Sequence, residues 1–388
     1  PLARRAAEAG YQVRGIDRYM DEAQLRALEA PGIETGADFG PVRSCDVVLI
    51  CVPTPLAEGR RPDTSFVERA ARDVAANLDR KGLTLVVLES TSYPGTTREI
   101  VLPALEEQGL VRGGQFLLAY APERVDPGMN PVSYRSIPRV VGGLDEDSGR
   151  AAELFYSTLV DGVHRVGAPE AAEMSKLLEN IFRAVNIALV NEMSLLCRRM
   201  GIDVWEVVEA AATKPFGFMS FKPGPGMGGH CIPVDPFYLA WRARQFDFEP
   251  AFIELAGRIN REMPHQIANW VAEALEGGDT ALAGARVLVL GAAYKEGISD
   301  TRESPALKIM EILEEKGCEV SYHDPYVPGV SVKGRELLSV ELTPEALRSC
   351  DCILIVTAHP GVDYRAVAAS GVPVVDTRNV VRGMASQG

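Results

Sequence analysis

The sequence lacks several features that would assign it to other classes of protein. No apolar run reaches the roughly 18 residues that a membrane span needs, and no signal-peptide pattern opens the chain. Positive charge is scarce, because 40 lysines and arginines stand against 53 acidic residues and leave a net charge of −13. This balance argues against nucleic acid or an anionic membrane as a partner, although a local basic pocket for phosphate is compatible with it.

Cysteine and histidine are also scarce. The seven cysteines are odd in number and scattered without paired spacing, which indicates free thiols and a reducing cytoplasm. No group of His, Cys and Asp residues has the spacing of metal ligands, so we expect no metal. What remains is a chain of 388 residues with ordinary apolar content, long enough for two or three domains.

One stretch stands out, residues 215–238, PFGFMSFKPGPGMGGHCIPVDPFY. Its five glycines and five prolines are incompatible with a regular helix or strand, so we expect a long shaped loop. Such loops are commonly functional, and this one carries Cys231 after a Gly-Gly-His turn and Asp235 four residues later. The alternative is a surface excursion that contains a buried structural cysteine.

The two ends of the chain contain an internal repeat. Residues 8–19, EAGYQVRGIDRY, match 315–326, EKGCEVSYHDPY, and residues 44–55, SCDVVLICVPTP, match 349–360, SCDCILIVTAHP. Each copy indicates a helix end with a glycine cap, a short strand ending in Asp, and then a buried hydrophobic strand. Strands that alternate with helices predict βαβ units, so the expected fold class is α/β with two doubly wound Rossmann-like domains.

We expect three parts: a Rossmann-like domain over residues 1–167, a central helical region over 168–280 that contains the cysteine loop, and a second Rossmann-like domain over 281–388. The second copy of the repeat has its own opening strand, RVLVL, followed by the loop GAAYKEG and a helix. The first copy has only nine residues before Gly10, so we expect its opening strand and glycine-rich loop to be missing from this sequence.

Residues at the expected strand ends of the first domain point to a dinucleotide. Asp17 ends the second strand, where an acid hydrogen-bonds an adenosine ribose and favours NAD over NADP, although Arg18 beside it weakens that preference. Two further strands are followed by Pro53 and Thr54 and by Thr91. Ligands bind outside the carboxyl ends of such strands, so both threonines are expected to face one crevice. Ordinary turn and cap roles are the alternative for these residues.

The middle of the chain is helical in pattern over 168–213, and a second long helix is expected over 249–275, with a new turn or a kink at Pro264. Lys176 and Asn180 are four residues apart and share one face of the first helix. That helix is too apolar on every side for a surface helix, so its polar groups require partners. A lysine that reaches solvent is the alternative. Central helices between two sheet domains commonly pair subunits, so we expect a homodimer.

Five separated motifs resemble the UDP-glucose/GDP-mannose dehydrogenase family and stand in the family's order. They are STSYPGTT (90–97), APERVDPG (121–128), SKLLEN (175–180), GPGMGGHCIPVDPFYL (224–239) and KEGISDTRESPA (295–306). Within the family, the cysteine loop is similar to that of bacterial UDP-N-acetylglucosamine 6-dehydrogenases. The resemblance implies NAD-dependent oxidation of a UDP-sugar, with UDP-N-acetylglucosamine as the first expectation. UDP-N-acetylmannosamine, UDP-glucose, or a non-catalytic nucleotide-sugar-binding protein are the alternatives.

The resemblance also implies a reaction, the four-electron oxidation of a sugar C6 hydroxyl to a carboxylate with two NAD⁺ and one water. Cys231 is implied as the nucleophile that traps the aldehyde as a thiohemiacetal and then carries a thioester. Lys176 and Asn180 are implied to stabilise the oxyanion. His230 invites a Cys-His dyad, but neighbours on an extended stretch point in opposite directions, so we prefer a structural or substrate-contact role for it.

Water and substrate are the remaining ligands that the resemblance assigns. Glu123 and Thr91 are implied to handle the hydrolytic water, and Asp235 either orients Lys176 or assists that water, so the general base stays open. Arg302 is implied to reach the substrate, the alternative being a surface salt bridge with Glu303 or Asp300. The full set of implied substrate-binding residues is Glu123, Arg124, Lys176, Asn180, Phe221, Gly228, Lys295 and Arg302. NAD is implied on the first domain and UDP on the second.

Overall fold

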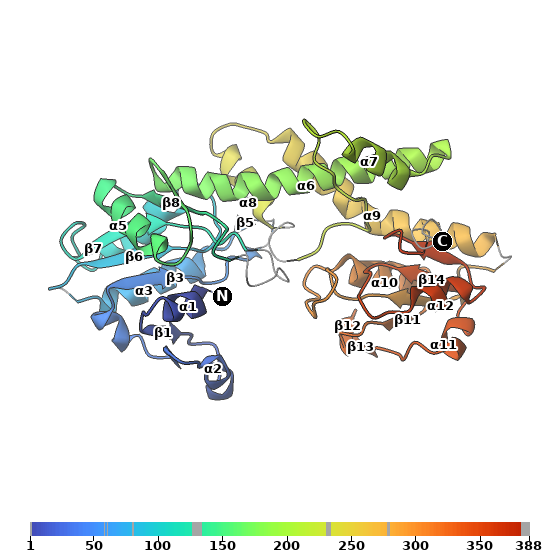
Figure 1. The fold of residues 1–388 in the computed structure, drawn as a ribbon, viewed down its shortest axis with the longest axis horizontal. Helices are drawn as coiled ribbons and strands as arrows, with labels where there is room; N and C mark the ends of the chain where they lie inside the picture. Colours follow the sequence, from blue (N-terminus) through green and yellow to red (C-terminus); the bar gives the residue numbers. More distant parts are fainter. Residues whose placement is uncertain are drawn as a thin grey trace. The chain divides into compact units, whose positions relative to one another are not determined.

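The computed structural model describes residues 2–381, apart from 58, 60, 80, 126–133, 230–233, 278 and 279. The chain divides into two compact units, the first formed by residues 1–179 and 237–248 and the second by 180–236 and 249–388. Both units contain mainly parallel strands with helices between them (Figure 1), which confirms the expected α/β fold class. None of the described helices combines the length and apolarity that a membrane span requires.

The first unit is built on a sheet with the strand order β3-β6-β7-β8-β9, and β1 and β2 form a separate parallel pair. Within the sheet the pairings are parallel except that of β7 with β8. The elements are α1 (Leu2–Glu8), β1 (Val13–Ile16), α2 (Glu22–Leu28), β2 (Ile33–Gly36), β3 (Val47–Ile50), β4 (Leu56–Ala57), β5 (Arg61–Pro62), α3 (Ser65–Asn77), β6 (Thr84–Leu88), α4 (Leu102–Glu106), β7 (Phe116–Tyr120), β8 (Arg139–Gly143), α5 (Glu146–Ser157), β9 (Val163–Val166), the start of α6 (Pro169–Met200) and most of α8 (Asp235–Arg244).

Successive residues of β6 pack on opposite faces of this sheet. Val86 and Leu88 belong to the apolar cluster that includes α3, whereas Leu85 and Val87 belong to the cluster that includes α5. The two helices therefore cover opposite faces (Figure 1). A strand buried on both faces reads as a continuous hydrophobic run, which is why VVLI and TLVVL were recognisable as strands. Since β3, β6 and β7 are parallel, their carboxyl ends lie at one edge, where ligands of such sheets bind.

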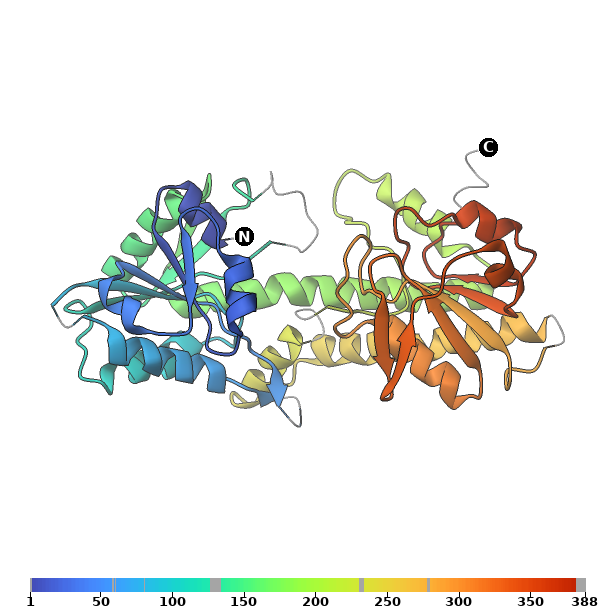
Figure 2. The same ribbon diagram turned by 90° about the horizontal axis from the view of Figure 1, so that it is seen from below.

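The second unit contains a fully parallel sheet with the strand order β11-β10-β14-β15 and an antiparallel β12–β13 pair. Its helix α9 continues through Pro264. In both views this helix runs beside the second-unit part of α6 (Figures 1 and 2), and Asn191 donates a side-chain hydrogen bond to Asn260 across the contact (3.0 Å). The elements are the rest of α6, α7 (Val204–Ala212), α9 (Ala251–Glu276), β10 (Arg286–Leu290), α10 (Pro305–Glu315), β11 (Glu319–His323), β12 (Gly329–Val332), β13 (Arg335–Leu338), α11 (Pro344–Arg348), β14 (Cys352–Ile355), α12 (Tyr364–Ala369) and β15 (Val374–Asp376).

The internal repeat is visible as repeated local structure. Gly10 follows α1 with a φ of +94°, and Gly317 follows α10 with a φ of +88°. Both values lie in the left-handed region that ends helices and favours glycine. Strands β1 and β11 then lead to Asp17 and Asp324, so the expected order of glycine cap, strand and acid is confirmed in both copies.

Two expectations about the middle of the chain were wrong. The segment expected to stay irregular to residue 238 becomes helical at Asp235, because an acid in the first turn and a proline just after it both favour a helix start. Helix α6 is not buried on every side: Leu177 is fully buried, but Leu178 is 63% exposed and Leu189 is 53% exposed. Its apolar residues thus include a face that no described part of this chain covers.

Candidate functional site

In the first unit, the loops that follow β3 and β6 are joined by hydrogen bonds. Pro53 and Thr54 lie in the first loop, and the Thr54 hydroxyl donates to the backbone oxygen of Thr91 in the second (2.8 Å). The Tyr238 hydroxyl of α8 donates in turn to the backbone oxygen of Thr54. The structure therefore brings Thr54 and Thr91 together at the carboxyl edge of the sheet. The Thr54 hydroxyl thus donates its proton to a hydrogen bond within the protein. A contact between Thr54 and the cofactor stays a prediction.

Asp17 follows β1, as the sequence indicates. Its Oδ1 accepts the backbone N–H groups of Tyr19 (2.8 Å) and Met20 (3.2 Å), which leaves Oδ2 without a partner among the described residues. The guanidinium of Arg18 forms an ion pair with Asp73 (3.0 Å) and none with Asp17. A carboxylate with one oxygen available at a parallel strand end suits a ribose diol, so these residues fit NAD.

Glu123 follows β7 at the same edge as Thr54 and Thr91. Its Oε1 accepts the backbone N–H groups of Arg124 (2.7 Å) and Val125 (2.9 Å), and the Arg139 guanidinium lies 3.1 Å away. Burial opposes ionisation of this carboxyl group, but the charge of Arg139 and the two backbone donors outweigh it and lower the pKa of Glu123. Glu123 is therefore held as an anion.

The Arg124 side chain is engaged within the first unit. Its guanidinium forms an ion pair with Glu179 of α6 (2.7 Å) and donates to the backbone oxygen of Pro138 (2.7 Å). A direct contact with the substrate would require these bonds to break, and that role stays a prediction.

Asn180 and Asp235 form a buried pair. Asn180 lies on α6, Asp235 opens α8, and the amide nitrogen of Asn180 donates to Oδ2 of Asp235 (2.5 Å). Lys176 lies about one turn earlier on α6, is half-buried and forms no ion pair with a described carboxylate. An ammonium group that has no counter-ion among the described residues is suited to an anionic ligand. Orientation of Lys176 by Asp235 stays a prediction.

The catalytic residue expected from the sequence, Cys231, and its neighbour His230 lie outside the described residues. The loop that leads to them is described up to Gly229, and the second unit anchors it at both ends. The Gly224 N–H donates to the Asn191 side chain (2.9 Å), and the Gly229 N–H donates to the backbone oxygen of Arg302 (3.0 Å). The position of the loop before Cys231 is thus set by α6 and by the segment that follows β10.

Glycine is required where this loop meets Tyr294. A β-carbon at Gly228 would lie 2.5 Å from Tyr294 Cβ, which is closer than any real contact, and one at Gly229 would lie 3.0 Å from the tyrosine ring. Gly229 also has a φ of +89°. The sequence-predicted residue Gly228 therefore lies where the backbone of the cysteine loop touches the loop after β10.

Other sequence-predicted substrate residues lie in the second unit. Lys295 is half-buried in the loop after β10. Arg302 is exposed and forms an ion pair with Asp300 (2.6 Å), which is the surface salt bridge given as the alternative to substrate binding. Its contact with a substrate stays a prediction. Phe221 packs edge-to-face on Phe182 of α6, with 5.8 Å between ring centres.

Arg378 is a candidate that the sequence analysis missed. It follows β15, its Nε donates to the backbone oxygen of Val356 (2.6 Å), and its Nη1 would lie 2.9 Å from a β-carbon at Gly224. It forms no ion pair with a described carboxylate, and burial lowers its pKa. The sequence could have indicated Arg378 by its position directly after a strand. The rule that ligands bind at strand ends selected Thr54 and Thr91 in the same way.

The repeated acid has a different role in the second unit. Oδ2 of Asp324 accepts the backbone N–H groups of Ala292 (2.7 Å) and Ala293 (2.9 Å) and lies 2.9 Å from Nε2 of His359. Burial opposes ionisation, but the bonds from His359 and the backbone lower the pKa of Asp324 to about 2. Unlike the carboxylate of Asp17, that of Asp324 holds the loop after β10 in place. This loop contains Lys295.

Three domain matches to known proteins cover most of the chain. Residues 9–160 match the NAD binding domain of the UDP-glucose/GDP-mannose dehydrogenase family, residues 170–262 its central domain and residues 288–383 its UDP binding domain. This order agrees with a NAD-binding sheet first and a UDP-binding sheet second.

Individual relatives match over nearly the same span. The chain is 40% identical to the UDP-N-acetyl-D-mannosamine dehydrogenase of Pyrococcus horikoshii, over 88% of this chain and 79% of that protein. It is 32% identical to the UDP-N-acetyl-D-glucosamine 6-dehydrogenase of Pseudomonas aeruginosa, over 89% of this chain and 81% of that protein. The solved structure of the P. horikoshii UDP-D-ManNAc dehydrogenase superposes with a TM-score of 0.85 at 36% identity, over 97% of this chain and 92% of that one.

Fold, strand-end residues and domain matches together define an NAD-dependent dehydrogenase that acts on UDP-sugars. The chain belongs to the UDP-glucose/GDP-mannose dehydrogenase family. The family resemblance, the NAD cofactor and the UDP-sugar substrate class expected from the sequence are therefore confirmed.

Proposed function

We propose that this enzyme oxidises the C6 hydroxyl of a UDP-N-acetylhexosamine to a carboxylate, with Cys231 as the nucleophile. Identity is higher to a UDP-N-acetylmannosamine dehydrogenase (40%) than to a UDP-N-acetylglucosamine 6-dehydrogenase (32%), which favours the manno sugar over the gluco sugar expected first. UDP-glucose is the third candidate.

One observation carries this proposal: within the second unit, the glycine loop before Cys231 packs directly on the loop after β10 and faces Arg378. Backbone donors and fixed cations are what a pyrophosphate requires, and glycine allows the backbone to approach it. A nucleotide held by Lys295 and Arg378 would thus be bound next to the segment that leads to the thiol.

The proposed chemistry balances with two NAD⁺ and one water per sugar. NAD⁺ accepts the hydride in each of the two oxidations. The Cys231 sulfur bonds to C6 of the aldehyde to give a thiohemiacetal, loss of the second hydride leaves a thioester, and water displaces the sulfur to release the carboxylate.

The remaining side chains have supporting roles in this scheme. Lys176 and Asn180 would stabilise negative charge on the C6 oxygen, and preorganised donors of this kind each contribute roughly 10²–10³ in rate. Asp235 would hold the Asn180 amide through their buried hydrogen bond (2.5 Å). Glu123, with Thr91, would position the hydrolytic water, because an anion with an available oxygen is the better acceptor.

The decisive experiment is a panel of UDP-N-acetylmannosamine, UDP-N-acetylglucosamine and UDP-glucose with NAD⁺. We expect two NADH per sugar and a uronic acid product with one of the N-acetylated sugars. One NADH per sugar would refute the thioester route. UDP binding without NADH formation would favour a nucleotide-sugar-binding protein instead.

Arg378→Met is expected to weaken UDP binding by about 10- to 100-fold, because charge-assisted hydrogen bonds are worth about 1.5–3 kcal/mol. Calorimetric titration with UDP measures this directly. Arg348→Met is the matched control, since Arg348 is exposed and pairs only with Glu345 among the described carboxylates (3.3 Å). Equal UDP affinity in both variants would remove Arg378 from the site.

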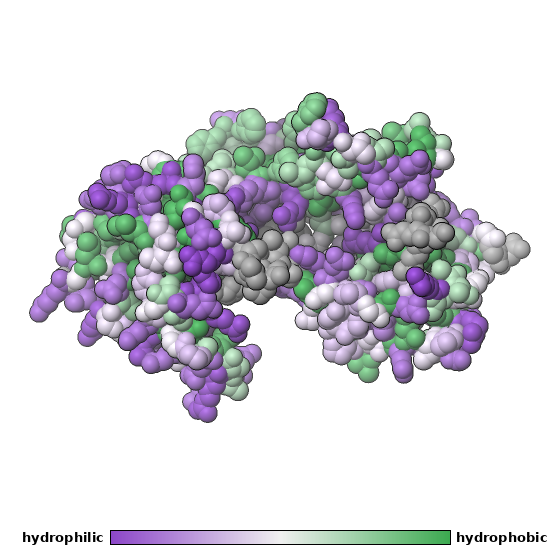
Figure 3. Space-filling view, in the orientation of Figure 1, coloured by the Kyte–Doolittle hydropathy of each residue, from purple (hydrophilic) through white to green (hydrophobic). Residues whose placement is uncertain are grey.

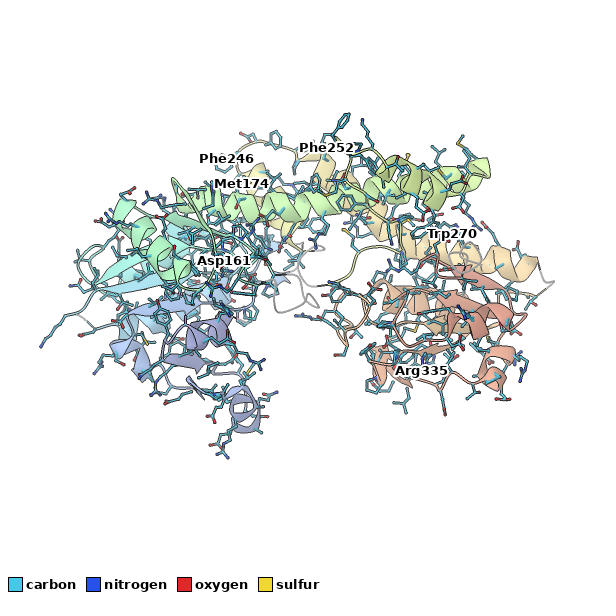
Figure 4. All side chains as sticks on the ribbon, in the orientation of Figure 1. Asp161, Met174, Phe246, Phe252, Trp270 and Arg335 are labelled. Atoms are coloured by element: carbon cyan, nitrogen blue, oxygen red, sulfur yellow. The ribbon has the colours of Figure 1, made fainter. Side chains whose placement is uncertain are left out.

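We also propose a homodimer formed through α6. Exposed apolar residues recur on this helix at spacings of three, four and seven, which places them on one face, and they are Phe182, Leu189, Met193, Leu196 and Met200. Figure 3 shows hydrophobic surface over this helix, and Met174, labelled in Figure 4, lies in its second turn. Sedimentation at micromolar concentration should give a dimer, and the Leu189→Glu/Leu196→Glu variant a monomer. A monomeric wild type would contradict the proposal.

The six described cysteines carry free thiols, which fits the reducing cytoplasm that we propose as the location.

A further inference from the structure

An antiparallel strand brings a cation to the carboxyl edge of the first unit's sheet. Strands β6 and β7 end at this edge, whereas β8 runs opposite to β7 and begins there. Tyr120, the last residue of β7, pairs with Gly142; Glu123 comes three residues after Tyr120, and Arg139, the first residue of β8, comes three residues before Gly142. Glu89 follows β6 at the same edge.

Arg139 joins two carboxylates that differ in exposure. Its Nη2 donates to Glu89, and its Nη1 lies 3.1 Å from Oε1 of Glu123. The side chains of Arg139 and Glu89 are each 4% exposed, but that of Glu123 is 39% exposed. Tyr156 of α5 donates its hydroxyl to Glu89, and its ring centre lies 5.0 Å from the guanidinium carbon. The network therefore runs from the core to an accessible carboxylate.

The two oxygens of Glu123 are not equivalent. Oε1 receives two backbone donors and Arg139, whereas Oε2 has one long contact among the described residues, from the Tyr134 hydroxyl (3.4 Å). A buried ion pair of this kind is poor evidence for stability alone, because desolvation offsets most of the attraction. A role in orienting Glu123 and in keeping its carboxyl group ionised explains the position of the Arg139 guanidinium.

We propose that Arg139 is a positioning residue for the oxidation: it bridges Glu89 and Glu123 and keeps Glu123 anionic, with Oε2 available to accept a proton or hydrogen bond. This inference rests on the proposed function, in which Glu123 handles the hydrolytic water. The titratable and charged groups around Glu123 in the described part of the chain are Arg139 of β8, Glu89 after β6, Tyr134 before β8, Tyr156 of α5, Cys51 after β3, and Arg124 with its partner Glu179 of α6.

The test is the dependence of kcat on pH, whose acid limb reports the base in the enzyme–substrate complex. Glu89→Gln perturbs the buried site but keeps Arg139, so we expect its acid limb to stay in place or move to lower pH. Glu89→Gln/Arg139→Met removes the cation without leaving a buried unpaired charge. Since a neighbouring positive charge lowers a carboxyl pKa by about one unit or more, we expect its acid limb to rise by about one pH unit.

Two further variants make the result decisive. Arg139→Lys keeps the charge but loses the planar fork, so we expect an unmoved acid limb and a kcat about tenfold lower. If the double variant does not fold, an unchanged kcat in Arg139→Lys still overturns the inference. An acid limb that is the same in Glu89→Gln and in the double variant also overturns it, provided that wild type oxidises the sugar. An inactive wild type would instead refute the proposed function.

Discussion

Cys231→Ala is expected to abolish formation of the uronic acid, with a loss of acid production on the order of 10³-fold or more. Without the sulfur, the aldehyde has no covalent route to the thioester, and the second oxidation has no activated substrate. Initial rates of NADH formation and mass spectrometry of the sugar product measure both steps. UDP affinity should be unchanged, because the nucleotide ligands proposed here are Lys295 and Arg378.

Five of the other six thiols make poor candidates for this role, because burial raises the pKa of each, including that of Cys51. Burial raises the pKa of Cys45, Cys318 and Cys350, and it raises that of Cys352 to about 12. Cys45→Ser is the matched control, because serine can keep the hydrogen bond to Pro41 that the thiol makes (3.4 Å), and it should retain full activity. Unchanged acid formation by the Cys231 variant would refute the nucleophile.

Local patterns were sufficient for much of the fold. A buried strand in a parallel sheet is apolar throughout, so SCDVVLI and SCDCILI revealed β3 and β14 and, with the glycine caps at Gly10 and Gly317, the repeat itself. The rule that ligands gather at strand ends selected Thr54 and Thr91, and the structure joins these two residues by a hydrogen bond; that both face a cofactor stays a prediction. The domain boundaries expected at residues 167 and 280 stay predictions.

Contacts between distant segments could not be predicted in this way. Arg139 comes within 3.1 Å of Glu123 because β8 is antiparallel to β7 and begins at the edge where β7 ends, and the RVVGG pattern of β8 is equally compatible with either direction. Arg378 reaches Gly224 across more than 150 residues of chain, a distance over which no periodicity carries information. The exposure of α6 was missed because an apolar helix reads the same whether its own chain or a partner covers it.

Gly228→Ala is expected to lower kcat/KM about 100-fold, the cost of misplacing reacting groups by about an ångström. The new methyl would lie 2.5 Å from Tyr294 Cβ and 3.0 Å from both the Glu303 backbone oxygen and Pro305 Cδ, so the loop must shift. Because Cys231 is three residues further on, the shift should reduce turnover as well as UDP affinity. Steady-state kinetics and UDP titration measure the two effects.

A second glycine-to-alanine substitution serves as a control. It separates the effect of the contact with Tyr294 from the general effect of replacing a glycine on the kinetics. Gly329→Ala in β12 would meet its nearest atoms at 3.6 and 3.7 Å, an ordinary contact, and should leave kinetics unchanged. Adding Tyr294→Gly to Gly228→Ala removes the β-carbon that causes the closest contact. Because the contacts with Glu303 and Pro305 remain, we expect partial recovery of UDP affinity. If the double variant binds UDP no better than Gly228→Ala, the Tyr294 contact does not set the position of the cysteine loop.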